Sequence, residues 1–196
     1  TEITSGGADI ESDENLAERI YLAPSGYSVA GPDDAYEYHT MAYNQDIIDV
    51  KVSSPAPTEV EIRFLIGEGE IPTGTVIKGL EEYLQDNNIR PLTDKVKVLA
   101  PEQEQFSISL SYYINRSDSA KANSIQSAVN AAIDDYVRWQ TYSIGRDINP
   151  SELTKRVVEA GAKRGEVTSP VFTTVPVTTV ARLSKKTVTY GGLEDD

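Results

Sequence analysis

The chain has 196 residues, of which 39% are hydrophobic and 25% are charged, and its formal charge is −13 at pH 7. This composition is typical of a globular protein, and the length suits one large domain or two small ones. The negative charge argues against nucleic-acid binding, because phosphate contacts rest on clustered Lys and Arg. No apolar run approaches the roughly 20 residues of a membrane-spanning helix. The absence of cysteine excludes disulfides and thiolate chemistry.

The N-terminal segment is unusually acidic. Residues 1–20 carry six acidic side chains and one basic side chain. This pattern predicts a solvated arm or linker over residues 1–13. The segment has no apolar centre and therefore does not read as a signal peptide. Because the chain does not begin with methionine, we expect it to be a piece of a longer protein.

Residues 14–45 are predicted to form a short helical segment. The stretches "ENLAERIYLA" and "DDAYEYHTMAYN" read as two short helices, separated by the breaker cluster "PSGYSVAGP". The segment is rich in tyrosine, a residue enriched where proteins meet proteins. It holds more tyrosines than two short helices bury easily. We therefore predict a candidate interface at Tyr27, Tyr36, Tyr38 and Tyr43, with the alternative that these rings only line a domain edge.

Residues 46–101 are predicted to form a middle lobe of order β-β-α-β. "DIIDVKVSSP" places Ile48, Val50 and Val52 on one face of a strand, and "EVEIRFLI" gives a second strand. The proline-containing link "PAPT" between them is short enough for a hairpin. "VIKGLEEYLQDN" has the periodicity of a helix with one apolar stripe, and "DKVKVLAP" gives a third strand.

The segment "IRPLTDKV" joins that helix to the third strand. Pro91 fixes its own φ and disfavours helical geometry at Arg90, so the helix must end before it. The side chain of Asp94 is suited to bond nearby backbone at the start of the strand. We predict that Arg90, Pro91 and Asp94 form a structural turn, and that an Arg90–Asp94 ion pair would add only ~0 to 1 kcal/mol.

Residues 102–196 are predicted to form a C-terminal lobe of order β-α-α-β. "QFSISLSYYI" alternates strictly between apolar and polar residues, which indicates a half-buried strand. A long helix follows, and then a second helix with Asn149 as N-cap, Pro150 in its first turn, Glu152 closing a capping box and Gly161 at its end. The Val- and Thr-rich remainder predicts one or two more strands. The fold class is therefore α+β, with two small mixed lobes, each a strand-helix-strand arrangement with a short sheet.

No catalytic, cofactor or metal site is predicted. His39 is the only histidine, which excludes a cluster of imidazole ligands and leaves it as the one possible base of a Ser-His-Asp triad. The glycines of "GEGEIPTG" do not have the spacing of a phosphate-binding loop. Pairs of carboxylates such as Asp33–Asp34 and Asp134–Asp135 are explained by solvation at helix ends or surfaces. A carboxylate-dependent hydrolase and a carbohydrate-binding module remain as alternatives.

Five segments together resemble one known family. They are, in chain order, "GGADIESDENLAERI", "SVAGPDDAYEYHTMA", "DVKVSSPAP", "IRPLTDKVKVLAP" and "DINPSELTKRVVEAGA". In this order they resemble the baseplate J-like family, the wedge proteins of contractile phage tails and related injection machines. The similarity runs from about Gly6 to Pro170. Family members usually carry a further N-terminal domain, so the chain resembles the middle and C-terminal portion.

The resemblance implies a structural role in the virion tail baseplate, after assembly in the bacterial host cytoplasm. Such proteins pair with copies of themselves and with neighbouring wedge proteins in a ring, and no catalytic residues come with the family. The chain departs from the family at two places. Thr58 and Glu59 stand where the family often has a glycine after "SPAP", and "GAKRGEV" is longer and more basic than the common form. Both departures bear on turn geometry.

Overall fold

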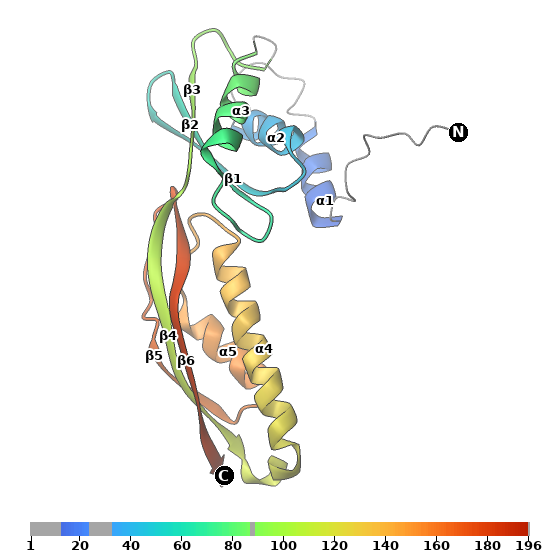
Figure 1. The fold of residues 1–196 in the computed structure, drawn as a ribbon, viewed down its shortest axis with the longest axis vertical. Coiled ribbons are helices and arrows are strands. Elements are labelled where there is room, and N and C mark those ends of the chain that lie inside the picture. Colours follow the sequence, from blue (N-terminus) through green and yellow to red (C-terminus); the bar gives the residue numbers. More distant parts are fainter. Residues whose placement is uncertain (1–12, 24–32, 87–88, 196) are drawn as a thin grey trace, which may run out of the picture. The chain divides into compact units, whose positions relative to one another are not determined.

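The computed structural model describes residues 13–23, 33–86 and 89–195 (Figure 1). The chain divides into two compact units, Thr1–Pro101 and Glu102–Asp196. Each unit contains a three-stranded mixed sheet together with helices, which confirms the predicted α+β class. The predicted arm lies outside the described residues except for Asp13, which begins the first helix, and Tyr27 lies outside them as well.

Two short helices come before the first sheet, as predicted. Helix α1 spans Asp13–Leu22 and helix α2 spans Asp33–Tyr43. Asp33 and Asp34 occupy the first turn of α2, where negative charge favours the helix dipole. The buried face of α2 contains Tyr36 and Met41, which belong to the same apolar core as the first sheet. Helix α2 is therefore held by packing rather than by its own helix propensity.

The first sheet has the order β1-β2-β3. Strands β1 (Ile47–Ala56) and β2 (Glu59–Ile66) form an antiparallel hairpin, and β3 (Lys95–Leu99) pairs parallel with β2. Helix α3 (Gly74–Leu84) provides the crossover that a parallel pair requires. The side chains of this core with the least exposure are Ile47, Ile62, Phe64, Leu80 and Leu84.

The buried face of β1 differs from the predicted one. Alternation predicts Ile48, Val50 and Val52 on the inner face, but Ile47 and Val50 are the buried residues, while Ile48 and Val52 are half-buried. The pairing with β2 shifts register between Ile47 and Asp49. A residue inserted in one strand moves the following side chains to the other face, and this shift is not visible in the sequence alternation.

The hairpin between β1 and β2 turns at Thr58, whose φ is +67°. This is the left-handed region, which favours glycine and is costly for a β-branched residue. The position is the one at which a glycine is expected from the family resemblance. The backbone therefore keeps the glycine conformation although the residue has changed. The carbonyl of Thr58 accepts a 2.7 Å hydrogen bond from the N–H of Lys95, which ties the turn to the start of β3.

The second sheet has the order β5-β4-β6, with the long strand β4 (Glu102–Asn115) at its centre. Strand β5 (Arg164–Ser169) pairs antiparallel with β4, whereas β6 (Thr179–Glu194) pairs parallel with it. Helices α4 (Ala122–Thr141) and α5 (Pro150–Glu159) lie on the same side of this sheet (Figure 1). The alternation predicted for β4 is confirmed, since the buried residues are Phe106, Ile108, Leu110, Tyr112 and Ile114.

The ends of α5 follow the predicted capping pattern with one exception. The side chain of Asn149 accepts a 2.9 Å hydrogen bond from the N–H of Ser151, and Gly161 has a φ of +105° just beyond the helix. Glu152 does not close the predicted capping box. Its carboxylate instead faces Arg156 at 2.8 Å and Lys155 at 3.9 Å, because charged partners on the next helical turn outcompete a neutral backbone N–H.

Candidate functional site

The predicted structural turn is closed by hydrogen bonds to backbone. A guanidinium nitrogen of Arg90 donates to the carbonyl of Asp94 at 2.7 Å, and the N–H of Asp94 donates to the carbonyl of Pro91 at 3.2 Å. The side chain of Arg90 therefore bonds the main chain of Asp94, whereas the sequence suggested an ion pair with its carboxylate. The carboxylate of Asp94 accepts a 3.2 Å hydrogen bond from the hydroxyl of the adjacent Thr93 and a second one from a donor distant in the sequence.

That donor is Tyr36, one of the four tyrosines predicted to form an interface. Its hydroxyl donates to the Asp94 carboxylate at 2.8 Å, and its side chain is only 2% exposed. Burial, followed by the hydrogen bond and the negative charge of Asp94, raises the pKa of Tyr36 well above its ordinary value. Tyr36 therefore belongs to the core, where it holds the turn against α2. Tyr36 does not contribute to the surface, because the sheet and the turn cover it.

Two of the predicted tyrosines do reach the surface, together with one that the sequence did not single out. Tyr43 of α2 and Tyr83 of α3 are each 36% exposed, and their ring centroids are 5.3 Å apart. Tyr38 is half-buried and close enough to Tyr83 to affect its pKa. We call Tyr38, Tyr43 and Tyr83 the tyrosine cluster. Tyr83 directly precedes the buried Leu84 in α3, but no sequence pattern indicates that α2 packs beside Tyr83.

Gly79 makes room for this arrangement. A side-chain carbon placed on Gly79 would lie 2.4 Å from the hydroxyl oxygen of Tyr43, so the ring of Tyr43 lies directly over the helix backbone. Glycine inside a helix costs about 1 kcal/mol relative to alanine. The glycine of α3 therefore has a packing reason, since any larger residue would displace Tyr43.

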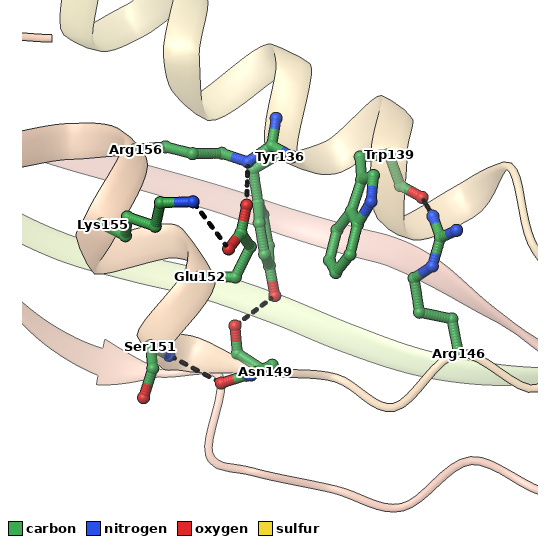
Figure 2. A network of polar contacts seen from close by, with 8 residues as sticks. All are labelled: Tyr136, Trp139, Arg146, Asn149, Ser151, Glu152, Lys155 and Arg156. Atoms are coloured by element: carbon green, nitrogen blue, oxygen red, sulfur yellow. Dashed lines mark hydrogen bonds and ion pairs between the residues drawn. The ribbon is translucent and has the colours of Figure 1, made fainter. Parts of the chain in front are cut away.

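A network of polar contacts in the second unit lies where α4 meets α5 (Figure 2). Tyr136 donates to the carbonyl of Asn149 at 3.2 Å, and Arg146 donates to the carbonyl of Trp139. The guanidinium carbon of Arg146 lies 4.3 Å from the centre of the Trp139 ring, which is the geometry of a cation–π contact. Figure 2 also shows the Glu152 carboxylate facing Lys155 and Arg156.

The chemistry of this network is structural. Burial first, and then the charge of Glu152, raises the pKa of Tyr136 to about 12, so the phenol keeps its proton at neutral pH. The Glu152 carboxylate is neutralised by two cations on its own helix. A general acid or base works best with a pKa near the operating pH. The contacts therefore fix the packing of α4 on α5, and the Tyr136 phenol is not suited to proton transfer near neutral pH.

Within residues 13–23, 33–86 and 89–195, no group of three or more His, Asp or Glu side chains is placed to hold a metal ion. The helices in these same ranges include none long and apolar enough to cross a membrane.

A second exposed apolar surface was missed by the sequence analysis. The loop between β5 and β6 exposes the side chains of Val171, Phe172 and Val177, which are 69%, 61% and 66% exposed. Its Val and Thr content predicts strands, and Pro170 and Pro176 restrict these to starts or edges, since proline interrupts strand pairing. In the structure the residues between Ser169 and Thr179 belong to neither strand. We call residues 170–178 the apolar loop.

Both units match models of one family. Residues 28–100 match the Baseplate J-like central domain, and residues 107–191 match the Baseplate J-like protein C-terminal domain. The two matches stand in chain order, and each falls within one of the two compact units. The chain belongs to the baseplate J-like family. The sequence resemblance is thereby confirmed.

Individual relatives of this baseplate J-like chain agree with the assignment. It is 28% identical over 165 residues to baseplate protein J of Escherichia phage P2, which covers 84% of this chain and 54% of the relative. A cryo-EM structure of the anti-feeding prophage (AFP) baseplate, six-fold symmetrised, contains a chain with the same fold, at a TM-score of 0.60 and 12% identity. That match covers 91% of this chain and 43% of the other. The chain thus spans about half the length of the proteins it matches.

Proposed function

We propose that the chain is a structural component of the baseplate wedge of a contractile phage tail or a related injection machine. The observation that carries this proposal is the pair of family matches, one to each unit and in chain order. The similarity to baseplate protein J of phage P2 and the fold shared with a chain of the AFP baseplate support it. The protein acts by presenting surfaces, within the virion tail baseplate after assembly in the host cytoplasm.

The partners in this proposal are other baseplate wedge proteins and further copies of the same chain. Permanent interfaces of this kind often bury ~2,000 Å² or more and are rich in apolar and aromatic side chains. The tyrosine cluster and the apolar loop provide such side chains on the first and second unit. The chain carries 31 acidic and 18 basic residues, and this balance argues against the concentrated positive charge that nucleic-acid binding requires.

We propose further that the protein is not an enzyme. A carboxylate-dependent hydrolase needs two acids with separated roles, one held protonated by burial. Glu152 and Glu194, two carboxylates with extensive contacts in the second unit, are instead paired with arginines. Digestion of purified peptidoglycan tests this point. Clearing that disappears when particular acids are replaced would establish a hydrolase and overturn the proposal.

The structural role is tested by sedimentation of the full-length protein, alone and mixed with its wedge neighbours. We expect the protein to enter a larger complex in the mixture. The double variant Val171→Ser with Phe172→Ser removes two of the three exposed apolar side chains of the apolar loop while the core residues stay intact. A full-length protein that remains monomeric with every wedge neighbour would contradict the proposal.

A further inference from the structure

The tyrosine cluster combines exposed aromatic faces with a local excess of negative charge. Residues 1–101 contain 19 acidic and 7 basic side chains, whereas residues 102–196 contain 12 and 11. The negative charge of the chain therefore belongs almost entirely to the first unit. Helix α2, which carries Tyr38 and Tyr43, has three acidic residues and neither Lys nor Arg.

The groups near the cluster include an acid, an ion pair and a neutral histidine. Asp86 is close enough to Tyr83 to contribute to its raised pKa, after burial and the neighbouring Tyr38. Lys78 of α3 is paired with Glu82 at 3.8 Å, so its charge is partly offset. His39 stacks edge-on against Tyr38, and burial lowers the pKa of its imidazole, which keeps it neutral at pH 7.

The geometry of the rings suits a planar cation. A guanidinium is attracted to the face of a tyrosine ring and stacks on it, while an acidic neighbour attracts its charge. The Tyr43 and Tyr83 rings are tilted by 39° rather than stacked face to face, and each of the two residues is 36% exposed. A contact of this kind between tyrosine and guanidinium occurs in the second unit, where the guanidinium carbon of Arg164 lies 3.8 Å from the centre of the Tyr113 ring.

We infer that the tyrosine cluster, Tyr38, Tyr43 and Tyr83, is a docking surface for an arginine side chain of a partner protein. The inference deepens the proposed structural role, on which it rests, by naming the chemistry of one contact. Charge complementarity selects the occupant, because the first unit is strongly acidic and its exposed aromatic faces attract cations. A second copy is the less suitable occupant, since two acidic first units repel each other.

The first experiment measures binding of a fluorescent peptide of alternating glycine and arginine to the full chain. A matched peptide has citrulline in place of arginine, which keeps the shape and removes the charge. We expect the double variant Tyr43→Leu with Tyr83→Leu to bind the arginine peptide roughly 3- to 10-fold more weakly, because the ring faces are lost while the net charge is unchanged. Tyr43→Phe with Tyr83→Phe keeps the faces and is expected to bind like the natural chain.

Substitutions at Gly79 and Gly74 of α3 provide a control of peptide binding in which every tyrosine is kept. Gly79→Ala places a methyl group where the Tyr43 hydroxyl lies and must move that ring, whereas Gly74→Ala meets no atom within 4 Å. Both changes add the same methyl group to α3. We expect Gly79→Ala to weaken peptide binding and Gly74→Ala to leave it unchanged, with circular dichroism confirming that both variants are folded.

Two results would overturn the inference. Equal binding of the arginine peptide by the natural chain and the Tyr→Leu double variant would mean that general negative charge is responsible. Equal binding of the citrulline peptide would mean that no cation is recognised. The proposed function is judged separately, by whether the unsubstituted full-length protein enters assembled baseplates, so a failure of one proposal is distinguishable from a failure of the other.

Discussion

The hydroxyl of Tyr36 and the carboxylate of Asp94 are joined by a 2.8 Å hydrogen bond across 58 positions of the chain. The bond connects helix α2 to the turn that precedes β3. On the other side of the turn, Arg90 binds the carbonyl of Asp94. Asp94 therefore receives one hydrogen bond from helix α2 and one from within the connector, which explains how a proline-containing segment is held in one conformation between α3 and β3.

Loss of the Tyr36 hydroxyl should destabilise the first unit. Hydrogen bonds to charged groups contribute about 1.5 to 3 kcal/mol, and because Asp94 is only half-buried we expect Tyr36→Phe to lower the free energy of unfolding by about 1 to 2 kcal/mol. Urea denaturation followed by far-UV circular dichroism measures the change. The control is Tyr21→Phe, whose side chain is 80% exposed. An equal loss in both variants would contradict the role given to Tyr36.

Thr58 offers the opposite prediction, a stabilising substitution. The left-handed conformation costs a non-glycine residue about 1 to 2 kcal/mol, and glycine avoids this cost. The greater conformational entropy of glycine in the unfolded state cancels part of the stabilisation. We expect Thr58→Gly to raise the free energy of unfolding by about 0.5 to 1 kcal/mol. Thr58→Ala keeps a β-carbon at the same φ of +67° and should give no such gain. Thermal denaturation of both variants decides the point, and a less stable glycine variant would refute it.

At the start of α5, we expect the stability to depend on a side-chain acceptor at position 149, whether or not that side chain is charged. Asn149→Ala removes the acceptor for the Ser151 N–H and should cost about 1 kcal/mol, whereas Asn149→Asp keeps an acceptor and should cost little. Trp139 is the only tryptophan and lies beside the network of Figure 2, so its fluorescence reports this unit. A urea midpoint that falls equally for Ala and Asp would argue against capping by the side chain.

The stability of the second unit should fall at alkaline pH. Burial raises the pKa of Tyr136 from 10.0 to about 12, so the folded state holds this proton more tightly than the unfolded state. The resulting stabilisation is fully present below pH 10 and is lost as the pH rises towards 12. Burial followed by Tyr190 also raises the pKa of Tyr112, so part of the dependence belongs to that residue.

Tyr136→Phe tests this linkage. The variant should be less stable than the natural chain at pH 8, by about 1 kcal/mol for the lost hydrogen bond to Asn149. Between pH 10 and 12 its stability should decline less steeply, because one titrating group has been removed. Trp139 fluorescence during urea unfolding measures both effects, and Tyr113→Phe is the matched control on β4. Parallel pH profiles for the natural chain and the Tyr136 variant would contradict the prediction.

Several local features were determined by the sequence alone. The alternation from Phe106 to Ile114 identified the central strand of the second sheet, and Asn149 with Pro150 identified the start of α5. Each of these signals lies within a few neighbouring residues, where side-chain periodicity and capping act directly on the local backbone. The five family segments are likewise a property of the sequence, and they indicate the baseplate J-like family without any information on tertiary contacts.

Only the tertiary structure decided which tyrosines are exposed. Tyr36 and Tyr43 lie on the same helix and look alike in the sequence, yet one is 2% exposed and the other 36%. The difference arises because Asp94 and the sheet cover Tyr36, whereas Gly79 and Tyr83 of α3 support Tyr43 at the surface. Exposure depends on packing partners that are distant along the chain. For the same reason, local sequence patterns do not predict the register shift in β1 or the parallel pairing of β4 with β6.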